Sequence, residues 1–458
     1  MALMTAALPP LTPRLRLLRH HAPLLPVLAT VLLLAAPVTT GDVSASGKVT
    51  PADAASAVLV GTAAVLLLRA RSRPLGPAAA AVLGAPVLGF AAAAVTSLDP
   101  GAGVAGFLRY VQVFVAVPAA VVLLLRDRRD FGVVAAAIVL LALVQGALGT
   151  WQYATGSGAS YMGKEVRAVG TFGPSDVMGM STVVAYGMVI AVGYALVPAP
   201  HGAPRWLRPA ATGCAALLVF PLTVSFSRGT WIATGAACLA MVLLAGRRQA
   251  VRVLAVLTAS AVVVVGGFGV GAGMIGERAA SITRVTDTPD PSVTDRYTLW
   301  SAALGMWREH PVTGVGLKRF PAERDGHATL GLSSASDTAG AGQEFAREPL
   351  LSPHNMYLLA LSEQGLLGCT LLAGGWAAFL VLGLRRLRTE AGRHRPRQAP
   401  GPGLTAVGLL IWQCVDFLYA DIGGPSTVLT AVLLGLAAWW ALHAPRDPVA
   451  GRGDGGAP

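Results

Sequence analysis

Apolar runs of about 18 residues or more recur along almost the whole of this 458-residue chain. A helix of that length crosses the hydrocarbon core of a bilayer. Only helices and closed barrels satisfy their own backbone hydrogen bonds in lipid, and runs this long are helical. The chain is 54% hydrophobic and 13% charged, against about 25% charged in soluble domains. The sequence therefore predicts an all-α polytopic membrane protein.

The apolar runs divide the chain into twelve candidate transmembrane helices. They lie at 22–40, 54–70, 78–96, 104–125, 131–152, 177–197, 210–226, 229–246, 251–272, 355–383, 404–420 and 424–443. The predicted parts are a cytoplasmic N-terminal segment (1–21), transmembrane helices 1–9 (22–272), an extracytoplasmic loop domain (273–354), transmembrane helices 10–12 (355–443) and a disordered cytoplasmic tail (444–458). Basic residues precede the first run, as in a signal peptide, but "AAPVTTGD" is a poor cleavage site, so an uncleaved span is favoured.

The arginines predict the orientation of these helices. They cluster at one set of ends, in Arg14/Arg16/Arg19, Arg69/Arg71/Arg73, Arg126/Arg128/Arg129, Arg205/Arg208, Arg247/Arg248/Arg252 and the run from Arg385 to Arg397. Cytoplasmic loops carry the excess of basic residues. Both termini are therefore predicted to face the cytoplasm, with the protein in the cytoplasmic membrane. The net charge of +12 follows from this placement, so it does not indicate a nucleic-acid partner.

The loop domain at 273–354 is too long for a simple turn and is predicted to be structured. Within it, "SVTDRYTLWSAALGMWREHP" predicts a helix that Pro311 ends. Tyr297, Trp300, Leu304 and Trp307 recur at helical spacing and form one apolar face. That face suits either a helix on the membrane surface or one packed on its own domain, and both interpretations stay open.

Ionisable side chains within spans are costly and usually functional. Six lie inside the predicted spans or at their ends: Arg109, Arg228, His354, Glu363, Asp416 and Asp421. All six fall in the outer half of the bilayer, beneath the loop domain, whereas a transporter would place them near the midplane. This asymmetry indicates chemistry on a substrate in the outer leaflet.

A synthetic reaction outside the cytoplasm needs a substrate that arrives already activated, and a lipid-linked diphosphate fits. Arginine pairs with phosphate oxygens through two parallel hydrogen bonds. Histidine takes a proton near neutral pH. Arginines and one histidine at the outer lip are therefore suited to displacing a diphosphate leaving group.

Several motifs resemble the O-antigen ligase superfamily, which includes O-antigen ligases, Wzy-type polymerases and bacterial O-oligosaccharyltransferases. The matching stretches are "FSRG" (226–229), "DRYTLWSAALGMWREHPVTGVG" (295–316), "PHNMYLLALSEQGLLG" (353–368) and, more weakly, "RAVGTFGPSD" (167–176). The order of the motifs and the long loop before the tenth helix also agree. The resemblance implies a GT-C-like fold and metal-independent, inverting glycosyl transfer, with no cofactor. The implied partners are a lipid-linked glycan donor, a glycan, lipid or protein acceptor, and membrane lipids.

The resemblance also assigns roles to residues. Arg228 and Arg296 would hold the diphosphate and stabilise the charge that develops on it. His354 would be the general base, and Asn355 would fix its ring. Lys318 and Arg319, in "GVGLKRF", either touch the donor or are solvated. No metal site is predicted, because the outer loops lack DxD spacing and the four cysteines lack ligand spacing.

The other candidates have structural interpretations. For Arg109, snorkelling or packing is favoured. Glu363 is expected to be either neutral or paired with an arginine, with a structural role favoured over catalysis. Asp416 and Asp421 are expected to balance the site arginines. Arg167 and Asp176 carry little weight, because many relatives have asparagine after the proline where this chain has Pro174-Ser175-Asp176.

The predicted function is transfer of a glycan from polyprenyl diphosphate to a hydroxyl on the outer face of the membrane, as in an O-antigen ligase. A polysaccharide polymerase and a protein O-oligosaccharyltransferase remain alternatives within the same class. A polysaccharide exporter and a non-enzymatic scaffold are alternatives from other classes. The arginine-rich composition suggests a GC-rich bacterial source.

Overall fold

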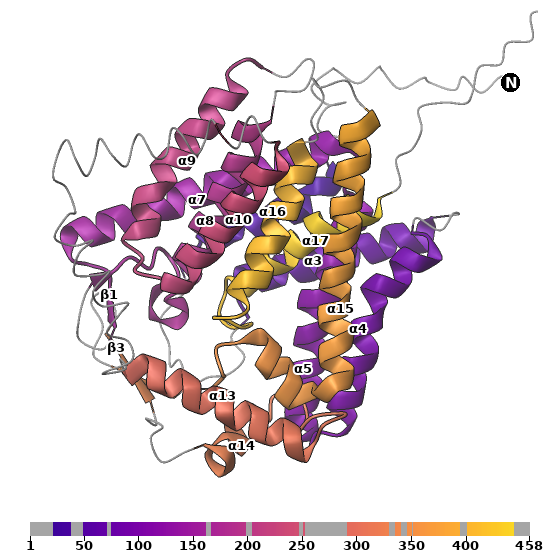
Figure 1. Ribbon diagram of the computed structural model, residues 1–458, viewed down its shortest axis with the longest axis vertical. Coiled ribbons are helices and arrows are strands. Elements are labelled where there is room, and N and C mark those ends of the chain that lie inside the picture. Colours follow the sequence, from indigo (N-terminus) through magenta and orange to yellow (C-terminus); the bar gives the residue numbers. More distant parts are fainter. Residues whose placement is uncertain are drawn as a thin grey trace, which may run out of the picture.

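A computed structural model describes most of the chain as a bundle of helices (Figure 1). It describes residues 22–37, 49–70, 75–161, 166–197, 204–246, 251, 291–328, 335–339, 346–349, 351–393 and 401–443. Every predicted span coincides with a described helix except 251–272, which lies outside the described residues. The predicted segments 1–21 and 444–458 also lie outside them.

The helices begin and end close to the predicted positions. In chain order they are α2 (Leu25–Leu32, between the 3-10 turns Ala22–Leu24 and Leu33–Ala35), α3 (Pro51–Arg69), α4 (Pro77–Val95), α5 (Pro100–Val111), η3 (Gln112–Ala116), α6 (Val117–Leu124), α7 (Arg128–Thr155), α8 (Gly179–Leu196), α9 (Leu207–Thr223), α10 (Arg228–Leu244), α13 (Pro291–Glu309), α14 (Phe320–His327), α15 (Met356–Arg393), α16 (Gly401–Asp416) and α17 (Thr427–Leu442). Because α5, η3 and α6 run on without interruption, they form one long helix.

Six helical segments among the described residues are long and apolar enough to cross a membrane. They are Pro51–Arg69, Pro77–Val95, Pro100–Leu124, Arg128–Thr155, Gly179–Leu196 and Met356–Glu390. Shorter apolar helices occupy Ala22–Ala35, Leu207–Thr223, Arg228–Leu244 and Thr427–Leu442. A polytopic helical membrane protein is therefore confirmed, and the total of twelve spans stays a prediction.

Local sequence explains where several helices begin. Thr50 and Asp53 form a capping box at the start of α3, in which each side chain accepts the other residue's backbone N–H. Asp99, Asp127 and Ser227 cap α5, α7 and α10 in the same manner, by accepting an N–H from the first turn. Proline follows the cap in α3 and α5, where its missing N–H costs nothing.

Helix α15 is not continuous, because its backbone leaves the helical region at Gly365 (φ 62°, ψ −164°). The segment 311–317 fills the break. Leu366 and Leu367 donate their N–H groups to the carbonyls of Pro311 (2.9 Å) and Val312 (3.1 Å). In return, the Ser362 carbonyl accepts the N–H of Val315 (2.9 Å) and the Glu363 carbonyl that of Gly316 (3.0 Å). The broken helix therefore keeps its backbone groups satisfied within protein, as lipid requires.

Helix α13 lies across one end of the bundle, with α14 beside it (Figure 1). It ends at Glu309, shortly before Pro311, as predicted. Its buried stripe consists of Leu299, Ala302, Ala303 and Met306, whereas Tyr297 is 62% exposed. Leu299, Ala303 and Met306 each come one residue before a predicted face position, so the predicted face lies beside the buried stripe. Helix α13 packs on α14 and α15.

Four short strands form a small antiparallel sheet that the sequence analysis did not predict. They are β1 (Ala159–Tyr161), β2 (Val166–Arg167), β3 (Ala335–Ala339) and β4 (Ala346–Pro349), in the order β2-β1-β3-β4. Ser160 pairs with Ala339, so the sheet ties the segment after α7 to the predicted loop domain. The sheet lies at the same end of the bundle as α13 (Figure 1).

Candidate active site

The segment between α16 and α17, residues 417–426, is the place where several helix ends meet; we call it the α16–α17 connection. The first residues of α15 bind it directly. Met356 donates its N–H to the carbonyls of Phe417 (2.9 Å) and Ala420 (3.0 Å). The side-chain amide of Asn355 donates to the carbonyl of Leu418 (3.1 Å). The connection therefore fixes the residues that precede α15.

Asn355 also starts α15, since its Oδ1 accepts the N–H of Leu358 (3.0 Å). This is a helix cap, and it uses the side-chain oxygen while the side-chain nitrogen holds Leu418. The preceding residue, His354, has φ 47°, a left-handed conformation that few non-glycine residues adopt. Asn355 thus fixes the backbone that carries His354, and the structure shows no bond from Asn355 to the His354 ring.

Helix α13 brings Arg296 to the same place. Trp300, one turn after Arg296, donates its indole N–H to the carbonyl of Pro353 (2.9 Å), next to His354. Burial lowers the pKa of His354; the Asp421 carboxylate raises it and the Arg296 guanidinium lowers it further. Arg296 and Asp421 therefore both act on the imidazole, one from α13 and one from the connection.

The start of α10 reaches the connection from another side. Gly229 lies so close to Tyr419 that a Cβ on the glycine would come within 2.9 Å of the tyrosine Cβ. Arg228, the first residue of α10, is exposed, while the capping Ser227 is buried. The residues next to Arg228 and His354 thus contact the α16–α17 connection, and the helix that carries Arg296 contacts the segment before α15.

Asp421 lies in this connection, directly after Ala420, whose carbonyl accepts the Met356 N–H. Its Oδ2 is buried and has no hydrogen-bond partner among the described residues. A buried carboxylate oxygen without a donor is costly, which is typical of functional sites. The sequence analysis expected Asp421 to balance the arginines, and it is the imidazole that the structure places under its influence.

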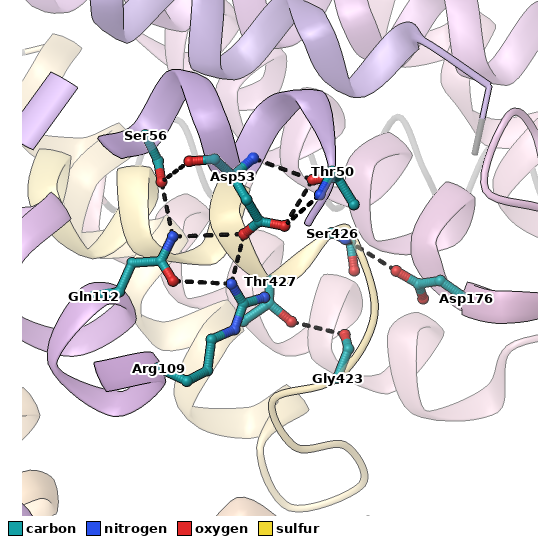
Figure 2. A network of polar contacts seen from close by, with 9 residues as sticks. All are labelled: Thr50, Asp53, Ser56, Arg109, Gln112, Asp176, Gly423, Ser426 and Thr427. Atoms are coloured by element: carbon teal, nitrogen blue, oxygen red, sulfur yellow. Dashed lines mark hydrogen bonds and ion pairs between the residues drawn. The ribbon is translucent and has the colours of Figure 1, made fainter. Parts of the chain in front are cut away.

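Asp176 holds the far end of the connection, and the sequence analysis gave it little weight. Its carboxylate accepts the N–H of Ser426 (3.0 Å), and Figure 2 shows it pointing at that residue. Burial raises the pKa of Asp176 to about 6, which the hydrogen bonds from Ser426 and Gly179 oppose. The one sequence signal was an acid directly before an apolar run.

Lys318 and Arg319 directly follow segment 311–317, which fills the break in α15. Lys318 is exposed and left-handed (φ 61°), and Arg319 forms an ion pair with Glu323 in α14. Glu363 accepts the backbone N–H of Phe320 (3.2 Å), and no described arginine forms an ion pair with it. Of the two alternatives for Glu363, neutral or paired with an arginine, the described residues show no arginine pair, and the backbone of the inserted segment contacts the carboxyl group instead.

Arg109 has the structural role that was predicted. Its guanidinium forms a 2.6 Å ion pair with Asp53 and donates to Gln112 (3.0 Å). Gln112 in turn donates to Ser56 (2.8 Å), so the network joins α3 to the long helix α5–η3–α6 (Figure 2). Asp416, the last residue of α16, is buried, and Arg167 lies in β2, where its side chain is outside the described part.

Comparison with known families supports the motifs. The model of the O-antigen ligase family (Wzy_C) aligns with this chain over one continuous stretch. Residues 213–373 match the O-antigen ligase family. The resemblance found in the sequence is thereby confirmed for a segment that runs from α9 into the first part of α15. No curated protein matches the chain.

The O-antigen ligase segment contains every residue predicted for the site. These are Arg228, Arg296, Lys318, Arg319, His354 and Asn355. Asp176 and Asp421, which the structure adds around them, lie outside the matched stretch on either side. The similarity to the O-antigen ligase family therefore covers residues 213–373, and the candidate site also draws on residues beyond that segment. Among the described residues, no cluster of three or more His, Cys, Asp or Glu could hold a metal ion.

Proposed function

We propose that this chain is a glycosyltransferase that moves a preassembled glycan from undecaprenyl diphosphate to a hydroxyl acceptor on the extracytoplasmic face of the membrane. One observation supports the proposal: residues next to Arg228 and His354 contact the α16–α17 connection, and the helix that carries Arg296 is bonded to the segment before His354. Two guanidinium groups and one imidazole at one place are the groups that this displacement needs. The O-antigen ligase match over the same residues supports the assignment.

Arg228 and Arg296 bind the diphosphate of the donor. A guanidinium group keeps its charge and binds two phosphate oxygens at once. As the glycosidic C1–O bond breaks, negative charge grows on the departing diphosphate. Donors that are already in position stabilise that charge without rearranging, which lowers the barrier.

His354 acts as the general base. The acceptor oxygen attacks the anomeric carbon from the face opposite the diphosphate, the C1–O bond to phosphorus breaks, and the acceptor proton passes to the imidazole. Burial keeps the pKa of His354 low, so the ring is neutral and ready to accept a proton. The carboxylate of Asp421 then stabilises the imidazolium that forms. Attack from the opposite face inverts the anomeric centre, and no step requires a metal.

The identity of the acceptor separates the members of this class. A saccharide acceptor of the same repeat makes the protein a polymerase, a lipid or wall glycan makes it a ligase, and a protein hydroxyl makes it an O-oligosaccharyltransferase. We place the ligase-type reaction first because the matching family is described as O-antigen ligase.

The proposal is tested by reconstitution of the purified chain with a glycan linked to undecaprenyl diphosphate. Release of undecaprenyl diphosphate and appearance of the glycan on each offered acceptor are measured. We expect His354→Ala, Arg228→Gln and Arg296→Gln each to lower transfer by roughly 100-fold or more. Arg308→Gln is the matched control, because Arg308 is an exposed arginine at the other end of α13. Wild-type turnover in the first three variants contradicts the proposal.

A further inference from the structure

The α16–α17 connection is held at both of its ends by residues far away in the sequence. At its start, Leu418 is bound by Asn355 and Phe417 by Met356. At its end, Ser426 is bound by Asp176. Asp421 stands between the two anchors and is the residue that influences His354. The position of the Asp421 carboxylate therefore depends on both anchors.

Asp176 is in close contact with the end of the connection that it binds. Its Oδ2 accepts the N–H of Ser426 (3.0 Å). Gly424 lies against the same group, and a Cβ on that glycine would come within 2.6 Å of the Asp176 carboxyl carbon. Gly424 also has φ 69°, which a glycine adopts without strain. The carboxylate thus fixes both the path and the end of the connection.

We propose that Asp176 is a positioning residue for the transfer reaction: by holding residues 424–426, it fixes the α16–α17 connection and so keeps Asp421 near His354. The two residues are neighbours because Met356, two residues after His354, donates its N–H to the carbonyl of Ala420, directly before Asp421 (3.0 Å). The carboxylate of Asp176 itself contacts no reacting atom. The inference rests on the proposed function, since it assumes that His354 is the base. It adds a residue from the segment before α8, outside the matched O-antigen ligase stretch.

Loss of this anchor has a specific consequence for the pH dependence of transfer. The described charged groups that face the imidazole are Asp421 from the connection and Arg296 from α13. When Asp421 moves away, the group that raises the pKa of His354 is lost, while Arg296 still lowers it. The pKa of the base then falls, and so does the rate at its plateau, because the imidazolium loses its stabilising carboxylate.

The test compares Asp176→Ala, Asp176→Asn and Asp99→Ala in the full chain, reconstituted with the lipid-linked donor. Asp99 is the matched control, since it is an exposed carboxylate that caps α5 and accepts the N–H of Ala102 (3.0 Å). For Asp176→Ala we expect the transfer rate at the plateau of the pH profile to fall roughly 10- to 100-fold. A displacement of the Asp421 carboxylate by about 1 Å is enough for a loss of this size. The acid limb of the pH–rate profile should also shift to lower pH.

The asparagine variant separates positioning from charge. Its side-chain oxygen still accepts the Ser426 N–H, so we expect it to recover at least part of the lost rate and to return the acid limb toward that of the wild type. Asp99→Ala should leave both unchanged. A lower rate with an unshifted acid limb indicates a purely structural role and overturns the inference. Wild-type behaviour of Asp176→Ala overturns it as well.

Two results distinguish this inference from the proposed function. If His354→Ala abolishes transfer while Asp176→Ala behaves as wild type, only the positioning role fails. If His354→Ala itself retains wild-type turnover, the proposed function fails and the Asp176 inference fails with it. Should Asp176→Ala fold poorly, Gly424→Ala tests the same contact, because its added methyl group displaces the connection from the carboxylate. It is expected to give the same downward shift of the acid limb.

Discussion

The indole of Trp300 donates a hydrogen bond to the backbone carbonyl of Pro353, 2.9 Å away and one residue before His354. This bond joins the helix that carries Arg296 to the segment that carries the proposed base. It crosses 53 residues of sequence and adds a side-chain hydrogen bond to the packing of α13 on α15. The relative position of Arg296 and His354 should therefore be sensitive to Trp300.

Trp300→Phe tests this alignment. Phenylalanine keeps most of the apolar volume but lacks the N–H, so the Pro353 carbonyl loses its donor. We expect a loss of about 1 kcal/mol in the free energy of unfolding and a clear fall in transfer rate. Trp307→Phe is the matched control on the same helix, because the Trp307 indole N–H is buried without a hydrogen-bond partner among the described residues. Equal effects of the two substitutions on transfer would contradict the alignment.

Asn355 has two separable tasks, since its oxygen caps α15 and its nitrogen holds Leu418. Asn355→Asp keeps the cap but loses the donor, and it places a negative charge against the Leu418 carbonyl. Asn355→Ala loses both. We expect alanine to lower the stability by about 1 kcal/mol or more, and aspartate to lower it less. Both variants should also lower transfer. Thermal unfolding in detergent measures the stabilities, and the reconstituted assay measures transfer. Unchanged transfer in the aspartate variant contradicts a role for the Leu418 contact.

The positions of the helices could be predicted because a span is a local feature. Length, apolar composition and the capping residues are all read within one stretch, as Thr50, Asp99 and Ser227 illustrate. The clustering of Arg228 and His354 on the outer side was predicted from orientation alone and stays a prediction. Helix positions and helix caps could be predicted because they depend on nearby sequence.

What could not be predicted depends on contacts between distant segments. The bond between Asp176 and Ser426 spans 250 residues, and neither residue carries a local signal for it. Likewise, Gly365 is an ordinary glycine in an apolar run until segment 311–317 enters beside it. The sequence also left open whether α13 packs on protein or lies on the membrane surface, and its buried stripe of Leu299, Ala302, Ala303 and Met306 depends on contacts with distant helices.

Gly365 is expected to be indispensable to the fold. A Cβ at this position would meet the Val312 carbonyl carbon at 2.3 Å, and the residue has positive φ. We expect Gly365→Ala to destabilise the protein by about 2–5 kcal/mol, from backbone strain and steric overlap together. Gly374→Ala, nine residues further along α15, is the control, because no atom lies within 4 Å of its added methyl group. Thermal unfolding of the two variants in detergent measures the difference, and equal stabilities contradict the insertion of segment 311–317.

The Arg109–Asp53 pair is expected to support the fold rather than the reaction. The arginine side chain is 26% exposed and that of Asp53 is 14% exposed, so removal of one partner leaves a partly buried charge. We expect Arg109→Gln and Asp53→Asn each to cost about 1–3 kcal/mol, below the value for fully buried pairs. The double variant should cost less than the sum, because neither charge remains alone. Additive losses in thermal unfolding would show that the two residues do not interact.

The pH dependence of transfer tests whether His354 is the titrating base. A base must be neutral, so the rate falls as the pH drops through its pKa. Burial and Arg296 lower that pKa, so the acid limb is expected below about pH 6.5, the ordinary value for histidine. Arg296→Gln removes a group that lowers the pKa, so the limb of its residual activity should move to higher pH. Asp421→Asn removes a group that raises it, so the limb should move to lower pH. Shifts in the same direction, or none, would exclude His354 as the titrating group.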